Sequence, residues 1–373
     1  MAVSRINEAG LDINQYGNRN LIINGAMQCY QRGSYTITTS GSPEYGGPDR
    51  FHMWSYTSLE QVVGDVTQST DVPSGQGFAY SRKFDVTTAE SAVAAGELLL
   101  IGQYIESQNL QHLEYGTSSA KDVTMSFWIK TTKAGTYCFF LQQDDGDRIY
   151  VKEYTVDASD TWEKKIITIP GDASGTLNND NGRGLWCAWV LMAGTDRHGT
   201  ANAWRATGAD YATSNQVNAV DSTSNNIYLT GVQLEVGDTA TDFEHRTFGD
   251  ELAKCHRYYQ RISETGGSGS NNYLRYGIGS NLSTTLTEIH VQSMVPMRAD
   301  PTLETTGTLS DYALYDSDSV VALTALVIEG GGHGTNQRFI LDGQVSSGLT
   351  DGGSCQLMNN NNSTSYIAFS AEL

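Results

Sequence analysis

Short segments of alternating apolar and polar residues, separated by turn residues, constrain the fold of this sequence more than any other feature. The clearest one spans residues 122–130, where Val123, Met125, Phe127 and Ile129 alternate with mainly polar neighbours. Because successive side chains of a β-strand point to opposite faces, this pattern predicts a strand with one buried face. Similar patterns recur from about residue 50 onward.

Turn residues join these segments into antiparallel pairs. The runs 136–142 and 148–156 flank the sequence Asp144-Asp145-Gly146-Asp147, and an Asp-Gly pair between two such runs is typical of a β-hairpin. Further strand-like runs are 51–57, 78–84, 162–169, 184–192 and 226–234. Short strands at this spacing predict an antiparallel β-sandwich.

Composition supports strands and excludes several classes of partner. Only 17% of the 373 residues are charged, and 39 are glycine; such a chain is rich in turns. The net charge of −19 repels a polyanion, so we expect no nucleic-acid partner. No apolar stretch is long enough for membrane insertion. The segment after Met1 lacks an apolar leader, so we expect synthesis in a host cytoplasm.

One segment departs from the β pattern. Phe248, Leu252, Cys255 and Tyr259 recur at spacings of four, three and four, which places them on one face of a helix. The sequence Gly266-Gly-Ser-Gly-Ser270 follows and is typical of a flexible joint. We therefore expect a connecting helix and linker over 247–272. The flanking parts would be an attachment arm at 1–19, a sandwich at 20–246 and a smaller C-terminal β domain at 273–373.

The helical face has two interpretations. Phe248, Leu252 and Tyr259 could pack against copies of themselves on a threefold axis and form an oligomer interface. The same face could instead pack on its own sandwich, because barely two heptads are present and a free-standing coiled coil needs more. The sequence leaves both open.

Patterns for catalysis or metal binding are weak. Asp144, Asp145 and Asp147 fit a hairpin turn better than a calcium loop, because the distal Glu of such a loop is missing. The seven histidines are scattered, and no Gly-x-Ser-x-Gly elbow is present. We predict no enzyme activity, no metal and no cofactor.

Aromatic residues are the stronger functional candidates. Trp186, Trp189, Trp204 and Tyr211 lie in or beside a Gly- and Asn-rich stretch from 176 to 226. Sugars stack their apolar faces on exposed aromatic rings, so we predict that these four residues bind a glycan. They could also lie in a subunit interface. Regular strands contain Trp54, Trp128 and Trp162, which we assign to the core.

Several motifs resemble, in order, those of one protein family. They are Asn20–Gly33, Ile105–Leu110, Thr124–Lys130, Trp162–Gly171, Ile227–Gly237, Phe243–Arg246, Glu251–Tyr259, Val295–Pro301 and Phe369–Leu373. Together they resemble bacteriophage tail-fibre and other virion proteins that have a carbohydrate-binding-module-like domain. The resemblance implies a jelly-roll β-sandwich followed by a small C-terminal β domain, in a virion protein that commonly forms a homotrimer.

We therefore expect a structural component of a bacteriophage virion, a short tail fibre or appendage that contacts host surface glycans. Residues 1–19 would dock on other virion proteins. An alternative is a capsid or baseplate decoration protein with a purely architectural role. A glycan-degrading tailspike is less favoured, because such proteins usually have longer, repeat-built scaffolds.

Overall fold

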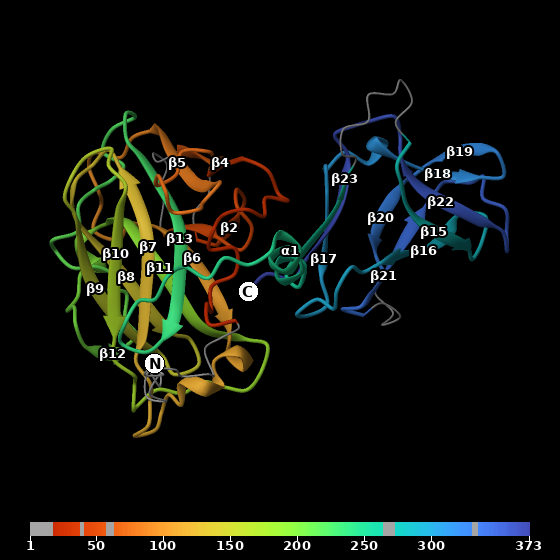
Figure 1. Ribbon diagram of the computed structural model, residues 1–373. Helices are drawn as coiled ribbons and strands as arrows, with labels where there is room; N and C mark the ends of the chain where they lie inside the picture. Colours follow the sequence, from red (N-terminus) through yellow and green to blue (C-terminus); the bar gives the residue numbers. More distant parts are fainter. Residues whose placement is uncertain (1–17, 38–40, 57–62, 264–272, 330–334) are drawn as a thin grey trace, which may run out of the picture. The chain divides into compact units, whose positions relative to one another are not determined.

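The computed structural model describes residues 18–37, 41–56, 63–263, 273–329 and 335–373. The chain divides after Phe248 into two compact units, here the N-terminal unit and the C-terminal unit. Nearly all regular structure in the described residues is β-strand, with one α-helix (Figure 1). Within the described part, no helix combines the length and apolar character needed to span a bilayer.

The N-terminal unit contains two antiparallel sheets (Figure 1). Sheet A has, in spatial order, β1 (Tyr35–Ile37), β4 (Val63–Ser69), β5 (Ser81–Thr88), β13 (Asn226–Val236), β7 (Val123–Thr131) and β10 (Glu163–Ile169). Sheet B has β12 (Trp204–Ala206), β9 (Arg148–Val156), β8 (Gly135–Gln143), β11 (Arg183–Ala193), β6 (Leu98–Glu106), β3 (His52–Tyr56) and β2 (Glu44–Tyr45). Short 3₁₀ turns are η3 (Ser107–Asn109), η4 (Gln111–Leu113) and η5 (Thr195–Arg197).

The connections confirm the predicted jelly-roll sandwich. After β3 the chain crosses from sheet B to sheet A, and it crosses again before β6, β7, β8, β10, β11 and β13. Such repeated crossing puts sequence neighbours on opposite layers, as in jelly rolls. The predicted hairpin is also present, because Gln143 pairs with Arg148 across the turn between β8 and β9.

The core lies between the two sheets and follows the predicted alternation. Val123, Met125, Phe127 and Ile129 of β7 all point into it. Sheet B contributes the alternate residues of its strands, among them Trp189, whose ring centroid lies 5.6 Å from that of Phe127. Burying one face of each sheet in this way supplies the main stabilisation of a sandwich.

The two ends of the N-terminal unit are joined by hydrogen bonds. Asn20 Nδ2 donates to Val232 O at 3.0 Å, and its Oδ1 accepts from Leu234 N at 3.1 Å. Glu244 Oε2 accepts from Asn20 N at 3.0 Å, and Arg246 Nη1 donates to Ile22 O at 3.1 Å. Motifs more than 200 positions apart therefore form one structural network.

The C-terminal unit contains α1 (Phe248–His256) and two sheets. Sheet C is β14 (Tyr259–Ser263), β23 (Tyr366–Ser370) and β17 (Thr302–Thr305). Sheet D is β19 (Ser319–Ala322), β18 (Tyr312–Asp316), β22 (Ser354–Asn359), β15 (Arg275–Asn281), β16 (Leu286–Gln292), β21 (Arg338–Gln344) and β20 (Ala325–Ile328). Another 3₁₀ turn, η6, spans Leu309–Asp311. The core between these strands includes a stacked Phe339–Phe369 pair.

The predicted boundary of the C-terminal domain at 273 is wrong. The helix ends at His256, and β14 pairs over its whole length with β23, near the end of the chain. The backbone N–H and C=O groups of Tyr259–Ser263 therefore form hydrogen bonds within a sheet. Pairing with a distant strand favours this conformation over continuation of the helix. The connecting segment predicted over 247–272 thus begins with a helix and a strand of the C-terminal unit. Residues 264–272 lie outside the described residues.

Candidate functional site

The outer face of sheet B, turned away from the core, carries a group of aromatic side chains. In β3, Met53 points into the core, so its neighbours His52 and Trp54 point outward. In β11, the core residue Cys187 likewise leaves its neighbour Trp186 facing outward. The aromatic cluster, as we call it, consists of His52, Trp54, Tyr56, Tyr104, Phe140, Trp186 and Tyr211.

Trp186 lies at the centre of the aromatic cluster. Its ring centroid is 4.7 Å from that of Trp54, 4.9 Å from Phe140 and 5.2 Å from Tyr104. These residues come from four strands, so the contacts bind β3, β6, β8 and β11 together. Tyr211, from the segment between β12 and β13, covers the group with its ring 5.2 Å from Phe140. Aromatic pairs at such distances add to the stabilisation from burial.

A glycine makes room for the rings. Gly102 of β6 pairs with His52 on one side and Ala188 on the other. A Cβ atom at Gly102 would lie 2.5 Å from both His52 Nε2 and Trp186 Nε1. Any other residue would displace one of these rings, so Gly102 allows both to lie on the sheet.

Several polar atoms of the aromatic cluster make no hydrogen bond within the described residues. Both ring nitrogens of His52 and the indole nitrogens of Trp54 and Trp186 are buried without a hydrogen-bond partner among the described residues. Burial, with smaller contributions from Arg82, Arg50 and Arg183, lowers the pKa of His52 well below its ordinary value, so this imidazole is neutral at pH 7. The cluster is therefore suited to stacking and not to acid–base chemistry.

One edge of the aromatic cluster is accessible. Tyr56 is 38% exposed, and Trp54 and Tyr211 are half-buried. The Arg197 guanidinium lies 3.9 Å from the centroid of the Tyr56 ring and helps to fix that ring by a cation–π contact. Three aromatic rings thus form an edge that a sugar with an apolar face can stack on.

The structure separates the predicted glycan-binding residues Trp186 and Trp189. They are three positions apart in β11, and an odd separation in a strand puts side chains on opposite faces. Trp189 is 1% exposed in the core, so the prediction that it contacts a glycan is wrong. Trp186 is 3% exposed and lies beneath the other rings. It supports the accessible edge and is too buried to contact a ligand itself, so that prediction is wrong as well.

Trp204 and Tyr211 have different positions. Trp204 lies in β12, pairs with Tyr150 and donates from its indole nitrogen to Pro170 O at 2.6 Å. This residue anchors the edge of sheet B and is not part of the aromatic cluster. Tyr211 contributes to the accessible edge, and its contact with a glycan stays a prediction.

Sequence reasoning missed Trp54 and Tyr56. Trp54, Trp128 and Trp162 were assigned to the core, but all three are half-buried and lie outside it. The alternation in 51–56 does place His52, Trp54 and Tyr56 on one face. Because both faces of that segment are apolar, the sequence alone does not tell which one faces the other sheet.

The residues predicted to form an oligomer interface are not equivalent. Phe248 is exposed and Leu252 is half-buried. Tyr259 is 2% exposed inside the C-terminal unit, where it pairs with Ser370, so its predicted place in an interface is wrong. The attachment arm lies outside the described residues as far as residue 17. Arg19 already belongs to the sandwich, because its backbone nitrogen donates to Glu244 Oε1 at 3.3 Å.

Comparison with known proteins gives weak similarities. No protein-family model matches the sequence, and no curated protein matches it. The enzymatically active domain of bacteriophage CBA120 tailspike protein 4 has a TM-score of 0.31 and 12% identity, covering 58% of this chain and 21% of that chain. A family 11 carbohydrate-binding module from Clostridium thermocellum, in complex with a β-1,3-1,4-mixed-linked tetrasaccharide, has a TM-score of 0.26 and 16% identity, covering 56% and 98%. TmCBM61 in complex with β-1,4-galactotriose has a TM-score of 0.27 and 10% identity, covering 59% and 99%. At TM-scores this low, the likeness says nothing about what this chain binds.

Proposed function

We propose that this protein is a structural component of a bacteriophage virion, a short tail fibre or similar appendage that contacts host surface glycans. The virion role is supported by the ordered motifs from Asn20 to Leu373 that resemble phage virion proteins. The glycan contact is supported by one structural observation, the accessible edge of Trp54, Tyr56 and Tyr211 on sheet B.

The chemistry of this edge suits a sugar. Pyranose rings present clusters of C–H groups that pack on aromatic faces, while their hydroxyls need donors and acceptors around the rim. Arg183, exposed beside the aromatic cluster with its guanidinium 4.2 Å from the Tyr104 ring centroid, supplies donors. Asp144, whose neighbour Gln142 donates to it at 2.9 Å, supplies an acceptor. In this proposal the protein binds and performs no chemistry.

The remaining parts of the proposal concern assembly. The protein would be made in the host cytoplasm and join the particle as a homotrimer, with residues 1–19 docking on another virion protein. Its position in the particle separates this proposal from an architectural decoration protein. Immunogold labelling of intact particles should show a few copies on a projecting appendage. Hundreds of copies on the capsid lattice would instead favour the decoration protein.

The first prediction concerns glycan contact. Purified protein should bind glycans extracted from the surface of host cells, and Tyr56→Ala or Tyr211→Ala should weaken binding roughly tenfold or more, about 1.4 kcal/mol or more, by removing a stacking ring. Binding is measured by biolayer interferometry on immobilised glycans. The matched control is Tyr273→Ala, which removes a tyrosine that is 43% exposed in the C-terminal unit. Unchanged binding by both sandwich variants, or loss only with Tyr273→Ala, would contradict the assigned surface.

A further inference from the structure

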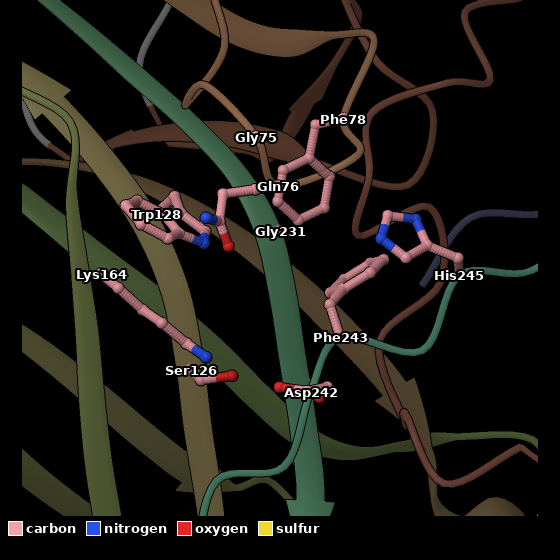
Figure 2. Close-up of a pocket in the computed structure, with 10 residues that line it drawn as sticks. All are labelled: Gly75, Gln76, Phe78, Ser126, Trp128, Lys164, Gly231, Asp242, Phe243 and His245. Atoms are coloured by element: carbon pink, nitrogen blue, oxygen red, sulfur yellow. The ribbon is translucent and has the colours of Figure 1, made fainter.

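A pocket of about 180 Å³ lies on the outer face of sheet A, on the other side of the sandwich from the aromatic cluster. Figure 2 shows the residues that line it: Gly75, Gln76, Phe78, Ser126, Trp128, Lys164, Gly231, Asp242, Phe243 and His245. They come from three strands of sheet A and two loops. None was singled out from the sequence as a binding residue.

The strands set the base of the pocket. Ser126 and Trp128 are two positions apart in β7 and share its outer face. Lys164 of β10 pairs directly with Trp128, so its side chain extends beside the indole. Figure 2 shows Lys164 reaching towards Ser126, with Trp128 on one side of the pocket and Phe243 on the other.

A β-bulge in β13 keeps the base open. The pairing of β13 with β7 shifts between Thr230 and Gln233, and Gly231 in this bulge has a φ of 59°. A Cβ atom at Gly231 would lie 2.6 Å from the Phe78 ring and 2.9 Å from the Trp128 ring. Only glycine combines this backbone conformation with this close approach, and bulges of this kind often lie beside binding sites.

The wall formed by residues 241–245 is held in place from below. Gln233 Oε1 accepts from Glu244 N at 2.8 Å, and Glu235 Oε1 accepts from Thr241 N at 2.9 Å. Phe243 also packs edge-on against Phe78, with the ring centroids 5.0 Å apart. Since Gln233 and Glu235 are buried, the wall has a fixed position before any ligand arrives.

The polar side chains of the pocket are not engaged in bonds with other described side chains. The Lys164 ammonium, the Asp242 carboxylate and the Ser126 hydroxyl have no side-chain hydrogen bond or ion pair in the described part of the chain. Ser126 is only 3% exposed, but its hydroxyl is accessible from the pocket, and Lys164 and Asp242 are exposed. Water satisfies these groups in the free protein, and the hydroxyls of a ligand can replace that water.

We propose that this pocket binds a single neutral pyranose ring. The apolar face of the sugar stacks on Trp128, and its hydroxyls bond to Lys164, Asp242 and Ser126. One cation and one anion balance, so the site favours a neutral polyol over an ion. The volume of about 180 Å³ is below the roughly 300–1,000 Å³ of pockets for drug-sized ligands. The pocket therefore encloses one sugar ring, and the remainder of a longer glycan would lie outside it.

This site is independent of the aromatic cluster, and its test separates the two. Full-length protein is titrated with D-glucose, D-galactose, D-mannose and N-acetyl-D-glucosamine, each followed by saturation-transfer NMR. We expect at least one of these sugars to bind with a dissociation constant on the order of 1 mM. Trp128→Ala and Lys164→Ala should each weaken that binding tenfold or more. Tyr273→Ala, which changes an exposed residue of the C-terminal unit outside both sites, should leave it unchanged.

Two further results guard the interpretation. Trp128→Phe retains a stacking ring and should keep most of the affinity, and Lys164→Ala changes an exposed side chain that the fold does not need. Binding that survives both Trp128→Ala and Lys164→Ala, or that is lost only with Tyr211→Ala, overturns the proposal. Absence of binding by all four sugars overturns it as well. So does preferential binding of free glycine, since a zwitterion would then be the better match to Lys164 and Asp242.

Discussion

At the scale of single residues, the direction of each side chain decides which aromatic rings can serve a ligand. Trp186 and Trp189 belong to the same strand, yet one lies in the aromatic cluster and the other in the core. Trp128 belongs to the strand whose alternate residues fill the core, and so it reaches the pocket on the opposite face. Amino-acid composition does not tell these tryptophans apart, whereas the two-residue period of a strand determines which face of the sheet each one occupies.

Asp144 gives a prediction at this scale. Burial raises its pKa from an ordinary value near 3.8 to about 6, helped by Asp145 and Asp147 and opposed by the hydrogen bond from Gln142 and the charge of Arg183. Between about pH 4 and 6 the folded state therefore holds a proton that the unfolded state has released. The contribution of Asp144 to the free energy of unfolding falls as pH rises through this window, and the loss is complete above it.

Replacing Asp144 by Asn should remove this effect, because the amide is neutral at every pH and still accepts the hydrogen bond from Gln142. We expect Asp144→Asn to raise the unfolding temperature more at about pH 8 than at about pH 4.5. Differential scanning calorimetry measures both. The matched control is Asp160→Asn, the same change at an exposed position. An equal gain at both pH values would show that the effect of Asp144 is not one of titration.

At the scale of elements, strand pairing overrides local pattern twice. The helical spacing that begins at Phe248 corresponds to a helix only as far as His256, after which β14 pairs with β23. The bulge at Gly231 interrupts an otherwise regular strand and creates the base of the pocket. In both places a long-range partner determines the backbone, and the local sequence only permits it.

The pairing of β14 predicts where the C-terminal unit can be cut. A fragment of residues 249–373 keeps β14 on the edge of β23, and it should unfold in one cooperative transition in urea. A fragment of residues 273–373 lacks that strand, which leaves one edge of β23 unpaired and part of its apolar face uncovered. We expect the shorter fragment to unfold at lower urea concentration or to aggregate. Equal stability of the two fragments would mean that β14 is dispensable.

At the scale of the whole molecule, the motifs that resemble phage virion proteins have a structural role in each unit. In the N-terminal unit, Asn20, Glu244 and Arg246 join its two ends. In the C-terminal unit, Arg298 donates to Ala371 O at 2.9 Å and to Glu372 O at 3.0 Å, and so holds the end of the chain. The recurring motifs therefore explain much of the fold. The aromatic cluster lies outside them, whereas more than half of the residues that line the pocket lie within them.

The proposed assembly gives a prediction at this scale. If the protein is an appendage of the fibre type, light scattering of the purified chain should give a mass of about three times 40.5 kDa. Phe248 is exposed and the partly buried Leu252 follows it by one helical turn, so Phe248→Ser should weaken a trimer held together at α1. The same substitution should leave the unfolding of isolated residues 1–248 unchanged. A monomer at all concentrations would favour a decoration protein that assembles only on the particle.

The sequence by itself determined the β-sandwich, its hairpins and the inward face of β7, because strand alternation and turn chemistry are local properties. It also placed Tyr211 among the candidate glycan-binding residues. It did not determine which face of residues 51–56 is buried, where the helix ends or that a pocket forms around Trp128. Only tertiary structure decided these points, since each depends on contacts between segments far apart in the chain: β3 with β6, β14 with β23, and β7 with residues 75–78 and 242–245.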